Sequence, residues 1–265
     1  MATRLLNLPQ ANVRAYVDAE ELALKAAHYF ARLADQYVMG DGLFTVALSG
    51  GITPQAMFKL LAQEPFYSTV PWSEIHFFWA DERCVPPAHA DSNYRAASEL
   101  LLSKVPVKPE NIYRFNGEEA EPARAAEVYC MKLERFFSAG LAANRTITAP
   151  ITMFPRFDLV LLGLGADGHT ASLFPHTAAL AEQEQIAVAN EAPQLTQRRL
   201  TLTVPSINNA RNVTFLVSGK EKSEVLRQVL MGPRRPEALP SQMIKPVNGT
   251  LLWLVDEAAA SGLGL

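Results

Sequence analysis

The chain has 265 residues and a mass of 29.1 kDa, and 49% of its residues are hydrophobic against 19% charged. This composition provides a sizeable core and excludes a disordered chain. Lys and Arg number 24 against 27 Asp and Glu, which gives a net charge of −3. A protein that mainly binds nucleic acid needs an excess of positive charge, so this class is disfavoured. A local basic pocket for a small anion stays possible.

Cysteine usage and the N-terminal segment bear on the compartment. Cys84 and Cys130 are too few for a disulfide framework or a four-thiolate metal site, and they suit a reducing environment. Residues 1–21 lack the apolar core of a signal peptide. The apolar stretch Phe157–Leu164 is interrupted by Asp158 and is much shorter than a bilayer requires. We therefore expect a cytoplasmic protein without a membrane segment.

Predicted helices and strands alternate along the chain. Asp18 and Glu21 form a variant of the capping box, and apolar residues at helical spacing up to Tyr37 predict a helix that ends at Gly40–Gly42. Buried strands are predicted over 43–48, 75–80, 112–115, 157–163, 199–204, 213–218 and 251–255. Helices are predicted over 54–61, 94–102, 121–137 and 222–230, and loops over Ala139–Pro155 and Gly232–Pro246. This alternation predicts an α/β fold, with a mostly parallel sheet and helices on both faces.

Segments with unusual residues follow the predicted strands. They are SGGITP (49–54), DER (81–83), GLGADGH (163–169) and SGKEK (218–222). In parallel α/β sheets, ligands bind beyond the carboxyl ends of the strands. If all the strands are parallel, these segments open on the same edge and form one site.

The segment Ser49–Pro54 predicts an anion site. Its glycines allow backbone N–H groups to approach a ligand, and the N-terminus of the following helix favours negative charge. It is neither a Walker motif nor a GxGxxG fingerprint, and an ordinary tight turn remains the alternative. Lys220 and Lys222, where a later strand turns into a helix, could reach the same anion. An isolated lysine in such a place more often only faces solvent.

The segment Asp81–Arg83 follows an aromatic strand. Arg83 offers a planar fork for a phosphate or carboxylate, and Asp81 could act as a base or orient hydroxyl groups. The alternative is an acid–base pair that only caps a loop.

Asp167 and His169 lie on a glycine-rich loop, flanked by Gly165 and Gly168. An imidazole titrates near neutrality, so a neutral histidine can take a proton from water. The glycine amides could donate to a developing oxyanion. A lone histidine is more often structural, and the residues by themselves leave both interpretations open.

Metal and serine-hydrolase chemistry are not indicated. The sequence has no HExxH or CxxC pattern, so we expect neither a metal nor another cofactor. It also has no Gly-x-Ser-x-Gly elbow, which argues against a Ser–His–Asp hydrolase of the usual α/β type.

Taken together, these segments resemble the 6-phosphogluconolactonase family, within the broader group that includes glucosamine-6-phosphate deaminase. The matching pieces are LSGGITP (48–54), FFWADERCVPPAHADSNY (77–94), FDLVLLGLGADGHTASLFP (157–175), RRLTLTVPSINNARNVTFLVSG (198–219) and KEKSEVL (220–226). The resemblance implies a single Rossmann-like α/β domain over residues 1–265. It also implies hydrolysis of 6-phospho-D-glucono-1,5-lactone to 6-phospho-D-gluconate, in the oxidative pentose phosphate pathway.

The resemblance further implies roles for individual residues. His169 would be the base that activates water, with Asp167 beside it. The Ser49–Thr53 loop, Arg83 and Lys222 would surround the phosphate and the other oxygens of the substrate. Candidate substrate-binding residues are therefore Ser49, Gly50, Gly51, Thr53, Asp81, Arg83, Arg199 and Lys222. The expected partner is a sugar-phosphate lactone, with no nucleic acid or membrane, and the chain is expected to be a monomer or a homodimer.

Two alternatives are a deaminase of the same group and a regulator from another class of protein. Deaminases of the same group typically carry acid-acid-Tyr where this chain has Arg83, and a run containing Asn-Glu-Pro where this chain has residues 170–175 (TASLFP). A sugar-phosphate-binding regulator would need a DNA-binding domain and a basic face, and the chain has no spare length for such a domain. Both comparisons favour the lactonase.

Overall fold

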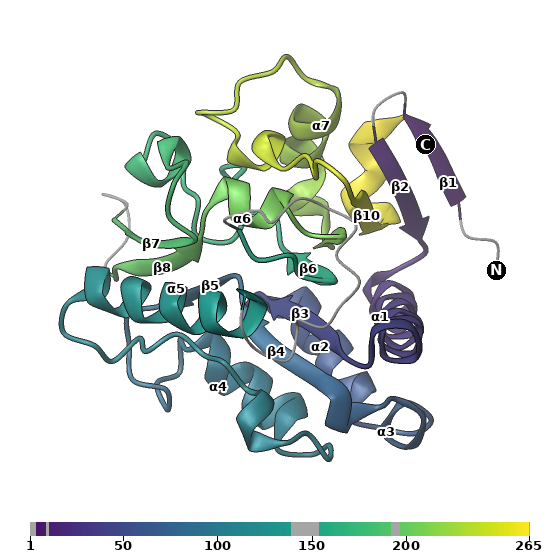
Figure 1. Ribbon diagram of the computed structural model, residues 1–265. Helices are drawn as coiled ribbons and strands as arrows, with labels where there is room; N and C mark the ends of the chain where they lie inside the picture. The colour runs from purple at the N-terminus through teal and green to yellow at the C-terminus, as the bar shows by residue number, and fades with distance from the viewer. Residues whose placement is uncertain (1–3, 9–10, 139–153, 192–196, 265) are drawn as a thin grey trace.

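The computed structural model describes residues 4–8, 11–138, 154–191 and 197–264. The predicted loop Ala139–Pro155 lies outside these ranges up to residue 153. The main sheet has seven strands in the order β1-β2-β10-β9-β6-β3-β4 (Figure 1). Each strand from β2 through β10, β9, β6 and β3 to β4 is parallel to its neighbour. Strand β1 pairs antiparallel with β2. The bounds are β1 Arg4–Leu8, β2 Ala11–Tyr16, β3 Phe44–Leu48, β4 Ile75–Trp79, β6 Leu159–Leu162, β9 Asn212–Val217 and β10 Thr250–Asp256.

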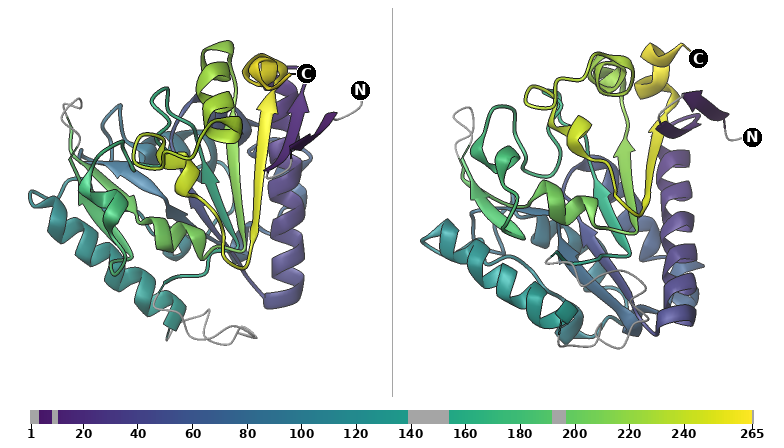
Figure 2. Two further views of the ribbon diagram at one scale, coloured as in Figure 1. Left: turned by 90° about the horizontal axis from the view of Figure 1, so that it is seen from above. Right: turned by 45° about the horizontal axis from the view of Figure 1, so that its top comes forward.

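Both faces of this sheet are covered. Every residue of β3 and β4 is buried, as expected for parallel strands that helices cover on both faces. On one face, Phe44 meets Phe30 of α1 (Ala19–Asp41), with ring centroids 5.5 Å apart. On the other, Phe78 meets Phe136 of α5 (Pro122–Ser138) at 5.3 Å. Figure 2 shows α1 and α5 on opposite sides of the strands. The predicted α/β fold is confirmed.

The predicted cap of the first helix is also present. The Asp18 carboxylate accepts a hydrogen bond from the backbone N–H of Glu21 at 2.8 Å. The helix ends at Gly42, whose φ of 77° is the left-handed conformation that glycine adopts without strain.

A second, three-stranded sheet departs from the all-parallel arrangement under which the four segments would open on one edge. Its order is β5-β8-β7, with both pairs antiparallel. The strands are β5 Asp81–Arg83, β7 Ala187–Asn190 and β8 Arg199–Leu202. The DER segment is therefore a strand and not a loop. The predicted strand 199–204 ends at Leu202, because Pro205 lies in the first turn of the next helix, α6 (Val204–Asn208).

The predicted strand 112–115 is wrong. Ile112 makes only an isolated bridge to Phe77, next to the bond from the Tyr113 N–H to the Phe77 carbonyl at 2.8 Å. A 3-10 turn at Pro109–Asn111 precedes it, and the ladder does not extend further.

The remaining helices include α2 and α7, which follow β3 and β9. Their bounds, with those of the other helices, are α2 Ile52–Leu61, α3 Phe66–Thr69, α4 Asn93–Ala97, α7 Ser223–Met231 and α8 Glu257–Ala260. The predicted helix 94–102 is split into α4 and a π-helical turn, Ser98–Leu102. Within the described ranges, no helix is both long and apolar enough to cross a bilayer.

Candidate active site

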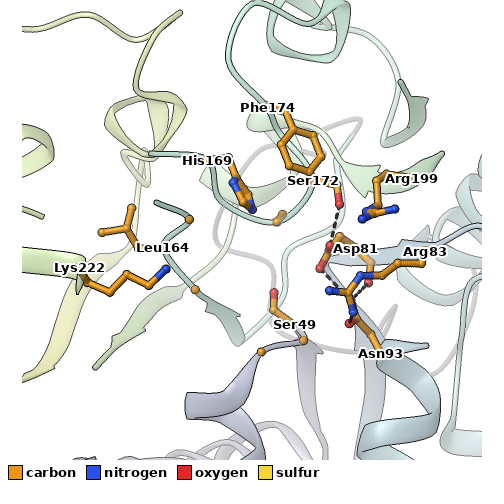
Figure 3. Close-up of a pocket in the computed structure, with 15 residues that line it drawn as sticks. Ser49, Asp81, Arg83, Asn93, Leu164, His169, Ser172, Phe174, Arg199 and Lys222 are labelled. Carbon is orange, nitrogen blue, oxygen red and sulfur yellow. Dashed lines mark hydrogen bonds between the residues drawn. The ribbon is translucent and has the colours of Figure 1, made fainter. Parts of the chain in front are cut away.

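A cleft of about 310 Å³ opens beyond the carboxyl ends of β3, β6 and β9 (Figure 3). The loop after β3, the loop after β6, the small sheet and the turn after β9 all contribute to it. Its lining residues are Ser49, Gly50, Gly51, Asp81, Arg83, Asn93, Gly163, Leu164, Gly165, His169, Ala171, Ser172, Phe174, Arg199 and Lys222. The structure thus brings together every predicted site residue except Asp167 and Thr53, which are not among the lining residues.

The floor of the cleft is suited to an anion. Gly51, with a φ of 110°, precedes α2, and no side chain in the described ranges caps that helix. The N–H groups of its first turn therefore have no side-chain acceptor, and the helix begins directly after the lining residues Gly50 and Gly51. The Ser49 hydroxyl is buried, with 5% of the residue exposed, and its Oγ has no hydrogen-bond partner within the described part of the chain. Such a hydroxyl is available to a ligand.

Thr53, in the first turn of α2, is not among the residues that line the cleft. Its Oγ1 shares a hydrogen bond of 2.8 Å with the Ser218 hydroxyl, which follows β9. This bond links the loops after β3 and β9, and the ligand contact of Thr53 stays a prediction. That link holds the glycine loop near Lys222.

Cationic side chains stand on both sides of the floor. Arg83 and Arg199 are register partners on β5 and β8, and Lys222 approaches from the opposite side (Figure 3). Burial, followed by the charge of Arg83, lowers the pKa of the Arg199 guanidinium. An anion bound between the two guanidinium groups would relieve this repulsion. Lys220, the other candidate lysine, is not among the residues that line the cleft.

Asn93 is a lining residue that sequence reasoning did not identify. Its Nδ2 donates to the Asp81 carbonyl at 2.9 Å and to Asp81 Oδ1 at 3.2 Å, and its Oδ1 accepts a hydrogen bond from Arg83 Nη1. A Cβ at Gly50 would collide with Asn93 Oδ1. Asn93 therefore fixes Arg83 against the glycine loop. Its only sequence signal was its place inside the segment 77–94.

Asp81 does not face the cleft as a free base. Its carboxylate accepts hydrogen bonds from Asn93 and, at 2.7 Å, from the Ser172 hydroxyl. Asp81 is 6% exposed. It joins the strand that carries Arg83 to the segment that follows His169, and this geometry favours a structural role over proton transfer.

Glu82 is buried beneath this arrangement. Its Oε1 accepts from the N–H groups of Arg83 and Asn93 at 2.8 and 2.7 Å, and its Oε2 from Ser92 Oγ and the Tyr94 N–H at 3.0 and 2.8 Å. Burial raises the pKa of this carboxyl group, and the backbone hydrogen bonds oppose the rise. Glu82 thereby holds the backbone from which Arg83 and Asn93 project.

We expect Glu82→Gln to raise KM for the substrate about tenfold, with a smaller change in kcat. The NH₂ group of the glutamine amide would face N–H and O–H donors and could not accept their hydrogen bonds. Each lost charge-assisted bond is worth about 1.5–3 kcal/mol. Steady-state kinetics tests this, with Glu99→Gln as the matched control, because Glu99 pairs with Arg95 outside the cleft. A KM equal to that of the control would show that Glu82 does not govern substrate binding.

His169 lies in the wall of the cleft and is held there by Asp167. His169 Nδ1 lies 2.5 Å from Asp167 Oδ1, and the His169 backbone N–H donates to the same oxygen at 3.1 Å. Burial alone would raise the pKa of Asp167, but the hydrogen bonds and charge of His169 outweigh it, so the pKa lies below its usual range. An ionised carboxylate can only accept, so Nδ1 carries the proton. The other ring nitrogen, Nε2, is then the basic one.

Two further contacts hold the imidazole. The Phe174 ring lies 4.5 Å from it between centroids, and a Cβ at Gly165 would collide with His169 Nδ1. The amides of Gly165 and Gly168 are used within the turn itself: they donate to the carbonyls of His169 and Gly165 at 2.8 and 3.0 Å. The expectation that these amides serve an oxyanion is therefore wrong, and donors in the described part of the chain include the cationic side chains and the Ser49 hydroxyl.

The side chains of the described residues do not form a metal-binding cluster. Over residues 4–8, 11–138, 154–191 and 197–264, no three His, Cys, Asp or Glu side chains cluster so that they could hold a metal ion. Cys84 is half-buried, and burial raises the pKa of its thiol to about 11, which makes it a poor nucleophile near neutrality.

A cationic cleft at the carboxyl edge of a parallel sheet, with a carboxylate-bound imidazole in its wall, is typical of enzymes that act on small anionic substrates. The chain belongs to the family described as glucosamine-6-phosphate isomerases/6-phosphogluconolactonase, whose model matches residues 17–253. The resemblance deduced from the sequence motifs is confirmed.

Individual relatives agree with this assignment. The chain is 41% identical over 223 residues to a 6-phosphogluconolactonase of Synechocystis sp., covering 84% of this chain and 85% of that protein. It is 36% identical over 257 residues to the probable 6-phosphogluconolactonase 2 of Oryza sativa subsp. indica, covering 95% and 89%. A solved structure of 6-phosphogluconolactonase from Trypanosoma cruzi matches with a TM-score of 0.82 at 26% identity, covering 99% of this chain and all of that one.

Proposed function

We propose that this protein hydrolyses 6-phospho-D-glucono-1,5-lactone to 6-phospho-D-gluconate, the lactonase step of the pentose phosphate pathway. The names of its relatives support this substrate. The observation that carries the mechanism is the imidazole of His169, which Asp167 holds at 2.5 Å in the wall of a cationic cleft. We place the protein in the cytoplasm, in keeping with its two free cysteines.

Substrate binding comes first in the proposed mechanism. The phosphate and the sugar oxygens contact Lys222, Arg83, Arg199, the Ser49 hydroxyl and the first turn of α2. The phosphate is remote from the reacting carbon, and its binding energy holds that lactone carbon near His169. His169 lies between Lys222 on one side of the cleft and the two arginines on the other (Figure 3). The cations also stabilise negative charge as it develops on the carbonyl oxygen.

Proton transfer follows from the state of the imidazole. A water molecule attacks C1 while His169 Nε2 takes one of its protons, and the carbonyl becomes a tetrahedral oxyanion. When the oxyanion collapses, the bond from C1 to the ring oxygen breaks, and the imidazolium returns its proton to that oxygen as it becomes a hydroxyl group. Asp167 stabilises the imidazolium in between.

We expect Asp167→Asn to lower kcat about 10²-fold and to move the acidic limb of the kcat/KM profile to lower pH. The carboxylate, whose pKa is lowered, stays ionised through that limb and favours the protonated imidazole. Its removal disfavours the imidazolium, so the neutral base persists to lower pH. Initial rates between about pH 5 and 8 test this. An unchanged limb would separate Asp167 from the proton transfer.

A lactone hydrolysis assay, corrected for the spontaneous rate, tests the proposed function. We expect turnover of the phospholactone, with no ammonia released from glucosamine 6-phosphate. Ammonia release would identify a deaminase. Saturable binding of sugar phosphates without turnover of either compound would identify a binding protein.

A further inference from the structure

The segment that follows α7, residues 232–246, packs against the turn that carries His169. Ser241, with 2% of the residue exposed, donates two hydrogen bonds to the Gly168 carbonyl oxygen, from its backbone N at 3.0 Å and from its Oγ at 2.8 Å. Leu239 covers the same glycine, since a Cβ at Gly168 would lie 3.2 Å from Leu239 Cα. A distant part of the chain therefore supports the residue that directly precedes His169.

The peptide between Gly168 and His169 is held at both of its polar groups. Ser241 binds its carbonyl, and Asp167 Oδ1 accepts its N–H at 3.1 Å. Because a peptide unit is planar, fixing both groups fixes its plane and the start of the His169 side chain. A carbonyl that accepts two hydrogen bonds also polarises its own peptide, which strengthens the N–H bond to the Asp167 carboxylate.

The supporting segment is itself anchored. The Gln242 side chain donates to the carbonyl oxygens of Gln228 and Pro233, both at 3.2 Å, and accepts from the Arg235 N–H at 2.6 Å. Asn208 Nδ2 donates to the Met243 carbonyl at 2.9 Å. These bonds tie the segment to α7 and α6, so the backbone that carries Ser241 is held in place.

We propose that Ser241 is a positioning residue for this reaction, which holds the Gly168–His169 peptide so that the imidazole keeps its bond to Asp167. Ser241 is absent from the residues that line the cleft, so it acts through His169 and not on the substrate. The inference rests on the proposed role of His169 as the base.

The test compares Ser241→Ala with Ser206→Ala. Ser206 is a matched control because it is also buried and its hydroxyl also donates to a backbone carbonyl, that of Ile186 at 2.7 Å, away from the cleft. Titration with 6-phosphogluconate gives the active fraction of each variant. Dividing the rate by this fraction corrects kcat for any loss of folded protein. NMR of the imidazole Nδ1 proton reports the bond to Asp167 directly.

We expect Ser241→Ala to lower kcat per active site about tenfold with KM unchanged, and to broaden or shift the Nδ1 proton signal. Ser206→Ala should match the native protein in both measurements. If Ser241→Ala keeps the kcat and the proton signal of the control, the inference is overturned. If the native protein does not hydrolyse the lactone, the proposed function fails instead, and the proton signal alone then decides whether Ser241 positions the pair.

Discussion

Replacing His169 by alanine is expected to lower kcat for the phospholactone by about 10³-fold or more, the largest effect of any single substitution in the cleft. The variant loses the group that takes the proton from water. Asp167 loses its ring partner at 2.5 Å, but it is not among the residues that line the cleft, so we do not expect its carboxylate to replace the base. The measurement is initial-rate hydrolysis, with the spontaneous rate subtracted at each pH.

Binding should survive this substitution. The cationic side chains and the glycine loop do not depend on the imidazole, so the Kd of 6-phosphogluconate should change less than about threefold. His28→Ala is the matched control, because His28 is an exposed residue of α1 outside the cleft. Native turnover in His169→Ala would refute the assignment of the base. Loss of product binding together with turnover would show that the imidazole also orders the cleft.

The part of the site on the main sheet was predictable from sequence. The segments after β3, β6 and β9 meet because parallel strands present their carboxyl ends on one edge. The motifs SGG, ADGH and the lysine at 222 are each local in the chain. The rule of topology predicted that these segments meet, and the family resemblance assigned Ser49, Gly50, His169 and Lys222 to one site. All four line the same cleft.

The arginine pair could not be derived in the same way. Arg83 and Arg199 meet across an antiparallel ladder between strands more than a hundred residues apart in the chain. Nothing in either segment specifies that register. The motifs indicated that both arginines line the site, but only the second sheet makes them neighbours.

Positioning residues were harder still. Asn93, Glu82 and Ser241 act through hydrogen bonds to backbone groups or to other side chains, and such bonds follow from the tertiary fold. Ser241 lies in a segment whose prolines indicated only a loop. A polar residue that is buried against a distant turn has no periodicity by which it could be recognised.

Removing the phosphate group from the substrate is expected to have the second-largest effect on kcat/KM. D-Glucono-1,5-lactone, which lacks it, should show a kcat/KM at least about 10³-fold lower, because each lost charge-assisted contact costs about 1.5–3 kcal/mol and several cations line the cleft. Part of the loss should fall on kcat, since the anchor also holds C1 near His169. Equal kcat/KM values for the two lactones would rule out a phosphate anchor.

The same pair of lactones identifies the cation that meets the phosphate. Lys222→Ala should lower kcat/KM for the phospholactone by about tenfold to a hundredfold and leave the unphosphorylated lactone nearly unaffected. Lys220→Ala is the matched control, because this lysine lies on the same 3-10 turn but is not among the lining residues. If Lys222→Ala instead slows both lactones equally, the ammonium stabilises the oxyanion and the Arg83–Arg199 pair binds the phosphate. In that case, Arg83→Ala should remove the preference for the phosphorylated substrate.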